Sequence, residues 1–140
     1  MKIVLDTNVL IAALLKKGKA YRLVVTFGLE KERFEIVTAI EQLNELKRVL
    51  REKFPGVLSP QEIGHFISLF RQAAILVRPT QGVKASPDPD DDIILAIAVA
   101  SKADYLVSGD KNHLLQLKKI NSTKIVSLSW LLKKIAPYGR

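Results

Sequence analysis

Short apolar runs alternate along the chain with longer segments in which apolar residues recur every three or four positions. The runs are rich in Val and Ile, as buried strands are, and predict strands over residues 2–5, 34–38, 104–110 and 123–128, with a short extended piece at 75–79. The segments with helical spacing predict helices over residues 9–15, 20–29, 39–54, 60–74, 89–100, 112–118 and 129–135. Strands that alternate with helices favour an α/β sandwich built on a parallel sheet.

The helix over 60–74 has the clearest boundary signals. Pro55-Gly56 ends the preceding helix, and Ser59, Pro60 and Glu62 form the pattern of a capping box with proline at the first helical position. No internal repeat, low-complexity segment or interdomain linker interrupts the chain. We therefore expect a single domain over residues 1–140, long enough to bury a core.

The composition narrows the class of protein. The chain has no cysteine, which excludes disulfides, thiolate metal sites and cysteine nucleophiles. Its longest apolar run, Ile93–Ala100, is far too short to cross a membrane. Asp6 and Asn8 interrupt the apolar N-terminal segment, which argues against a signal peptide, so we expect a cytoplasmic protein.

The chain is basic, with a formal net charge of +8 and a pI near 9.8. From Lys111 to Arg140 there are seven Lys or Arg residues and no acid. A basic surface favours association with a polyanion such as RNA. Taken alone, however, the basic C-terminal segment is better explained as a solvated helix face.

Four aspartates at positions 88, 90, 91 and 92 stand directly before the longest apolar run. A helix start explains two or three of them, with Asp88 as the N-cap, Pro89 at the first helical position, and acids at the positive end of the helix dipole. A helix start does not need four aspartates, so the run suggests a second role.

Other acids are placed to meet this run. Asp6 directly follows the first strand and Asp110 follows the strand YLVS, so neighbouring parallel strands would bring both carboxylates to one crevice. Glu45, in the helix after the second strand, can lean toward the same edge. When carboxylates lie so close together, shared protons or bound cations must reduce their mutual repulsion. A site made only of oxygen ligands favours Mg²⁺ or Mn²⁺. A basic protein with such a site suits phosphodiester hydrolysis in a nucleic acid.

Three motifs together resemble the PIN domain family of metal-dependent ribonucleases, which includes the VapC-like toxins of toxin–antitoxin pairs. They are Asp6-Thr7-Asn8 after the first strand, DPDDDIILAIA over residues 88–98, and SGD at 108–110. The resemblance covers nearly the whole chain. It implies a three-layer α/β/α sandwich with a short parallel central sheet and a divalent-metal-dependent endoribonuclease that acts on single-stranded RNA through an attacking water molecule. It also implies Mg²⁺ or Mn²⁺ as cofactor, a small antitoxin as partner, and a homodimer.

The family carries four acids around one or two divalent ions. Carried over residue by residue, the resemblance implies that the catalytic and metal-binding acids are Asp6, Glu45, Asp91 and Asp110. Asp91 stands seven residues before Ala98, which fits the family spacing. Asp88 is an additional candidate ligand, whereas residues 90 and 92 are less favoured.

The second acid is the least secure assignment. Glu45-Leu46 matches the family pattern best, and Glu41 is the competing choice. A glutamate on a helix is usually solvated, and Arg48 could pair with Glu45 across one turn.

The resemblance also implies supporting polar residues. Thr7 and Asn8 fill the polar positions beside the first acid, and Ser108 is the hydroxyl near the fourth. Asn112 stands where many relatives carry a further acid, so metal binding would rest on the other carboxylates.

Other function classes remain open at this point. A phosphatase of the haloacid-dehalogenase type would need a second aspartate where Asn8 stands, and a receiver domain would need an adjacent acid pair after the first strand. A non-catalytic module that binds nucleic acid or protein would explain the charge, but would leave the acids as an accident of turns and caps.

Overall fold

Six strands form one central sheet in the computed structural model, which describes residues 1–86, 88–109 and 114–136. Their order across the sheet is β3-β2-β1-β4-β6-β5. The strands are β1 (Lys2–Leu5), β2 (Glu35–Thr38), β3 (Ile75–Leu76), β4 (Tyr105–Ser108), β5 (Lys119–Ile120) and β6 (Thr123–Ser127). The pairs β1–β2, β1–β4, β2–β3 and β4–β6 are parallel, and the edge strand β5 runs antiparallel to β6.

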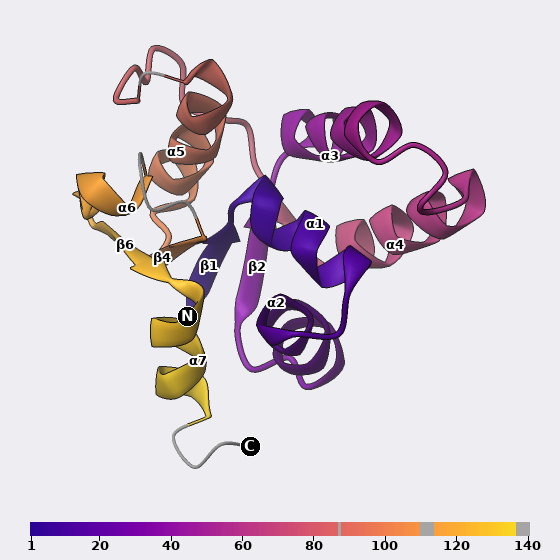
Figure 1. Ribbon diagram of the computed structural model, residues 1–140. Coiled ribbons are helices and arrows are strands. Elements are labelled where there is room, and N and C mark those ends of the chain that lie inside the picture. The colour runs from indigo at the N-terminus through magenta and orange to yellow at the C-terminus, as the bar shows by residue number, and fades with distance from the viewer. Residues whose placement is uncertain (87, 110–113, 137–140) are drawn as a thin grey trace.

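Helices connect and cover these strands (Figure 1). They are α1 (Thr7–Leu15), α2 (Lys19–Tyr21), the π-helix η1 (Arg22–Glu30), α3 (Ile40–Lys53), α4 (Pro60–Ala73), α5 (Pro89–Ser101), α6 (Leu114–Leu117) and α7 (Leu128–Ile135). None of the helices in the described ranges is both long and apolar enough to cross a bilayer.

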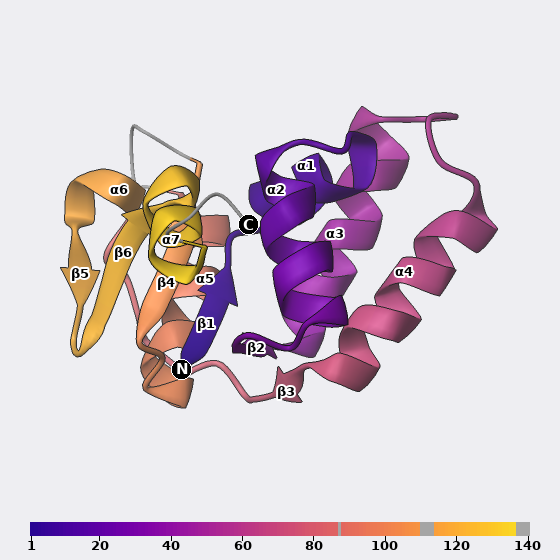
Figure 2. The same cartoon turned by 90° about the horizontal axis from the view of Figure 1, so that it is seen from below.

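Alternate residues of the strands face two separate hydrophobic cores, because successive side chains of a strand point to opposite faces. Ile3 and Leu5 of β1 pack in one core with residues of α1, η1, α3, α4 and α7. Val4 packs in the other core, with residues of α5 and α6. Figures 1 and 2 show α1, α2 and α3 grouped on one side of β1 and α5 on the other. The prediction of a three-layer α/β/α sandwich is therefore confirmed.

The structure differs from the sequence-based prediction at two elements. The predicted helix over 20–29 is a short α-helix that continues as a π-helix. Strand β5 was not predicted, because two residues are too few to show a periodicity. Asn121, with φ of 51°, lies in the left-handed region and makes the tight turn that folds β5 back on β6. The sheet is thus parallel except at this edge.

The connections place a topological switch point between β1 and β4. The chain passes from β1 to β2 and β3 on one side, and then returns to β4 on the other side of β1. Leu5 pairs with Val107, and the backbone N–H of Asp6 donates to the Val107 carbonyl at 2.9 Å, which extends the pairing to the end of the strands. Ligands of open α/β sheets bind at such a point.

A buried glutamine fastens the ends of β1 and β2 to α3. The Gln42 amide nitrogen donates to the Leu5 carbonyl at 2.6 Å and to the Thr7 hydroxyl at 3.4 Å. The Thr38 hydroxyl donates to the Gln42 side-chain oxygen at 2.6 Å. Gln42 and Thr38 are fully buried, so these groups have no access to water.

We predict that Gln42→Leu lowers the free energy of unfolding by about 2–3 kcal/mol, because it leaves the Leu5 carbonyl and the Thr38 hydroxyl buried without this partner. Urea denaturation measures the change. Gln61→Leu, at an exposed position of α4, is the matched control and should shift stability by less than about 0.5 kcal/mol. Equal effects of the two substitutions would contradict this role of Gln42.

Candidate active site

Asp6 lies at the carboxyl end of β1 and is 4% exposed. It occupies the N-cap position of α1, but its side chain makes no capping hydrogen bond. Its Oδ2 atom instead accepts a hydrogen bond from the hydroxyl of Ser108, at 3.0 Å. Ser108 is fully buried at the end of β4. The pairing of β1 with β4 therefore aims the Asp6 carboxylate at the edge of the sheet where β4 ends.

Glu45 lies on α3 and is partly buried, with an unusual environment for a carboxylate. Its Oε2 atom is buried and has no hydrogen-bond partner in the described part of the chain. Burial, and to a smaller extent the negative charges of Asp90 and Asp6, raise the pKa of Glu45 from the ordinary value of 4.5 to about 7. A hydrogen bond with the Thr7 side chain and the positive charge of Arg48 oppose this effect.

Thr7 links Glu45 to the buried network behind it. The Thr7 hydroxyl accepts a hydrogen bond from Gln42 and also contacts the Glu45 carboxylate. A continuous polar chain therefore runs from Thr38 on β2 through Gln42 and Thr7 to Glu45. The position of Glu45 is thus tied to the ends of the two strands that hold the site.

Two of the four clustered aspartates have structural contacts at the start of α5. Asp88 is the N-cap, as predicted, and its Oδ1 atom accepts from the Asp90 N–H at 2.9 Å. The Oδ1 atom of Asp92 accepts from the N–H groups of Ala85 and Ser86, at 3.0 and 2.9 Å. Asp92 thereby holds the preceding connection against the helix.

Asp90 contacts α3, whereas Asp91 contacts the connection that precedes α5. The Oδ2 atom of Asp91 accepts a hydrogen bond from the Ser86 hydroxyl at 3.2 Å. Asp90 forms an ion pair with Arg48, at 3.7 Å, and Arg48 also pairs with Glu52, at 3.6 Å. The pairing of Arg48 with Glu45 that the sequence left open is therefore replaced by ion pairs with these other two acids.

A cavity of about 240 Å³ lies between α1, α3 and α5. Its acidic lining residues are Asp6, Glu45, Asp88, Asp90 and Asp91. Asn8 also lines the cavity, together with the cationic residues Arg48 and Lys53. The structure thus brings together three of the four predicted catalytic acids and the additional candidate Asp88. The fourth predicted acid, Asp110, lies outside the described residues, as does Asn112.

Glu41 does not share this cavity. It lies one turn before Glu45 on α3 and lines a different cavity, whereas Glu45 faces Asp6 and the aspartates of α5. Between the two candidates for the second acid, the geometry therefore favours Glu45.

The cavity offers the ligands that a hard divalent cation prefers. All of its acidic side chains offer carboxylate oxygens as ligands. The unpartnered Oε2 atom and the raised pKa of Glu45 indicate that the negative charge here is not fully neutralised by nearby positive groups. Within the described ranges, no three acidic or histidine side chains are already gathered as a complete metal-binding cluster. The carboxylate oxygens of the cavity are thus suitable ligand atoms for Mg²⁺ or Mn²⁺, and they supply part of a ligand set.

Sequence patterns did not identify Gln42, Arg48 and Lys53 as parts of the site. Gln42 stands on the buried side of α3 among apolar residues, so a polar residue on an apolar stripe was the only available signal. Arg48 and Lys53 are cations on an amphipathic helix, where solvated side chains are the rule.

We predict that metal-free protein becomes less stable as Glu45 ionises between pH 4.5 and about 7, because the folded chain holds this proton more tightly than the unfolded chain. Glu45→Gln should therefore raise the free energy of unfolding at pH 8 by about 1–2 kcal/mol, a value discounted for partial exposure, and should have little effect near pH 4.5. Urea denaturation in EDTA at both pH values tests this. The exposed Glu41→Gln control should leave the pH dependence unchanged, and an identical gain there would contradict the assignment.

Comparison with known proteins agrees with this architecture. The sequence model of the PIN domain matches residues 2–112. The fold is similar to that of a chain in the crystal structure of VapBC2 from Rickettsia felis bound to a DNA fragment from their promoter. The TM-score is 0.61 over 91% of this chain and 98% of that chain, at 17% sequence identity, so the likeness concerns the fold. No curated protein matches the sequence. Because the PIN domain match spans most of its length, this chain belongs to the PIN domain family.

Proposed function

We propose that this protein is a divalent-metal-dependent endoribonuclease that hydrolyses phosphodiester bonds of single-stranded RNA. PIN domains are generally nucleases, which supports the reaction class. The observation that carries the proposal is the Glu45 carboxylate, whose buried oxygen lacks a partner in the described residues and whose pKa is raised beside Asp6 and Asp90. Such an environment is typical of a carboxylate that a cation completes.

In this proposal, Asp6, Glu45, Asp91 and Asp110 hold Mg²⁺ or Mn²⁺, with Asp88 as an additional ligand. When bound, the cation neutralises the acids, polarises the scissile phosphate and increases the acidity of a water molecule. The protein supplies the orientation of the ligands. Ser108 holds Asp6, and the polar chain through Gln42 and Thr7 holds Glu45.

The cations of the cavity have a separate part in the proposal. Arg48 and Lys53 line the same cavity as the acids, and both are on α3. A guanidinium and an ammonium group at this position can bind phosphate oxygens of the RNA strand and hold it against the acidic residues. The net charge of +8 supports the approach of a polyanion to a locally acidic cavity.

We also propose two protein contacts. The fold likeness to a chain of VapBC2 supports an antitoxin as partner and a role as the toxin of such a pair. A homodimer is supported by three exposed apolar residues on α4 and the edge strand β3, namely Leu69, Ile75 and Leu76, which are 46%, 36% and 40% exposed.

We predict that the protein cuts labelled single-stranded RNA in the presence of Mn²⁺ or Mg²⁺ and that EDTA abolishes cutting. Asp6→Asn, Glu45→Gln and Asp110→Asn should each lower the cleavage rate by about 100-fold or more, because each removes a charged ligand. Glu30→Gln, an exposed carboxylate that does not line the cavity, should retain the full rate. A DNA oligonucleotide of the same sequence, assayed in parallel, distinguishes ribonuclease from deoxyribonuclease activity.

We further predict that Mn²⁺ raises the melting temperature of the protein, since an ion that binds only the folded state at about 100 times its Kd adds about 2.7 kcal/mol of stability. The increase should be lost in Asp6→Asn and retained in Glu30→Gln. Binding of the ion without cleavage of single-stranded RNA would leave the metal site standing but would contradict the proposed ribonuclease activity on single strands. If wild-type protein binds no divalent ion, the nuclease proposal is wrong and a non-catalytic binding module becomes the better explanation.

A further inference from the structure

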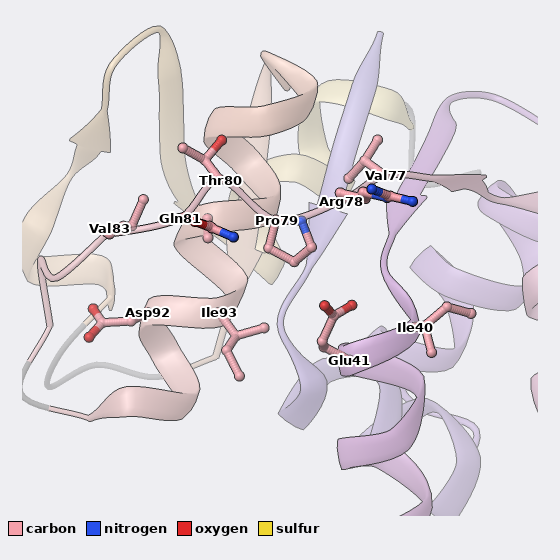
Figure 3. A pocket seen from close by; sticks show the side chains of 12 residues that line it. Ile40, Glu41, Val77, Arg78, Pro79, Thr80, Gln81, Val83, Asp92 and Ile93 are labelled. Atoms are coloured by element: carbon pink, nitrogen blue, oxygen red, sulfur yellow. The ribbon is translucent and has the colours of Figure 1, made fainter.

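A second cavity of about 560 Å³ lies between the start of α3, the connection after β3, and α5 (Figure 3). Helices α3 and α5 thus line both this cavity and the acidic one. On α3, Glu41 of this cavity lies one turn, about 6 Å, before Glu45 of the acidic cavity. On α5, Asp92 and Ile93 line the second cavity, whereas Asp91 before them and Ile94 after them line the acidic one. A nucleic acid strand with its phosphate in the acidic cavity therefore has its neighbouring nucleotide within reach of the second.

The outer wall of the second cavity is the connection between β3 and α5, and backbone contacts hold it in place. The N–H of Val77 donates to the Thr38 carbonyl at 3.0 Å, and the N–H of Thr80 donates to the Ala96 carbonyl at 3.2 Å. Asp92 holds the end of the connection through the two hydrogen bonds described above. The wall is therefore formed in the protein itself and does not depend on a ligand.

The lining of this cavity combines apolar side chains with polar ones. Val77, Val83 and Ile93 are partly buried and pack against the core that covers the α5 face of the sheet. Glu41, by contrast, makes no hydrogen bond or ion pair with the residues that the structure describes, and Figure 3 shows its carboxylate pointing from α3 toward Pro79, with Ile93 beside it. Thr80, Gln81 and Asp92 also line the cavity, and the Oδ1 atom of Asp92 already accepts two backbone hydrogen bonds. Apolar walls with a few polar groups suit a nucleobase, whose faces are apolar and whose edge is polar.

A carboxylate decides which part of a nucleotide and which base can enter. Glu41 and Asp92 give the lining two negative charges against the one positive charge of Arg78, which disfavours a phosphate, so the base is the group that fits here. A carboxylate only accepts hydrogen bonds. Guanine is the base whose Watson–Crick edge presents two adjacent donors, the N1–H and the 2-amino group, whereas uracil places two carbonyl acceptors around one donor.

We propose that this cavity binds the base of the nucleotide next to the scissile phosphate and that Glu41 makes it selective for guanine. The inference rests on the proposed ribonuclease function and names a specificity residue for it. Glu41 would accept from both guanine donors, and the base would lie between Ile93 and the Pro79 wall of the cavity.

The test uses single-stranded oligouridine RNAs of equal length that carry one guanosine, one inosine or no purine at the centre, cut in Mn²⁺. Wild-type protein should cut next to guanosine with a kcat/KM about 10-fold or more above that for oligouridine. Inosine, which lacks the 2-amino group, should lose most of this advantage. Glu41→Gln should bring the guanosine-to-uridine ratio of kcat/KM close to one, whereas the Glu30→Gln control should keep the wild-type ratio.

The outcomes separate this inference from the function on which it rests. If wild-type protein cuts no RNA, the ribonuclease proposal fails, and this proposal fails with it. If it cuts all oligonucleotides equally, or if Glu41→Gln keeps the wild-type preference, only the guanine cavity is wrong. If Glu41→Gln abolishes cutting of every oligonucleotide together with the Mn²⁺-induced rise in melting temperature, Glu41 belongs to the metal site, and the base-binding proposal is overturned.

Discussion

The parallel pairing of β1 with β4 is the contact on which the site depends. It brings residues about a hundred positions apart in the chain into one hydrogen bond, between Ser108 and Asp6. The connections diverge on either side of this pair, which leaves an opening at the carboxyl ends of the strands, and the acids of α3 and α5 are turned toward it. A carboxylate as buried as Asp6 is tolerated there because a hydroxyl partner is built into the neighbouring strand.

The fold could be read from the sequence to the extent that local patterns specify it. The strand at 2–5, the capping box of Ser59 and the N-cap of Asp88 were all predictable, because each depends on residues close together in the chain. The meeting of Asp6 with Glu45 was predictable only through the order of elements in a parallel sheet. Strand β5 and the π-helix η1 were not, since two residues carry no periodicity and the start of η1 has ordinary helical spacing.

Apart from the N-cap role of Asp88, the roles of the clustered aspartates could not be assigned from the sequence, and the reason is geometric. The helix that follows them is apolar on nearly all sides, because both α3 and the sheet cover it, so no amphipathic stripe indicates which aspartate faces the site. In the structure, the four aspartates make different contacts. Asp88 caps the helix and Asp92 anchors the preceding connection. Asp90 pairs with Arg48 of α3, and Asp91 accepts from Ser86 and lines the acidic cavity. Only tertiary contacts distinguish these neighbours.

Helix α3 connects the separate parts of the proposed mechanism. Residues 41, 45 and 48 recur at helical spacing, so one stripe carries the proposed base contact, the carboxylate with the unpartnered Oε2 atom, and one of the two cations of the acidic cavity. The same helix is fastened to β1 and β2 from its buried side by Gln42. Because a helix is rigid over two turns, the distance between the group that would read the base and the group that would bind the metal is set by the fold. A substitution at residue 41 can therefore change substrate selection without changing metal binding, while the distance between the two groups stays fixed.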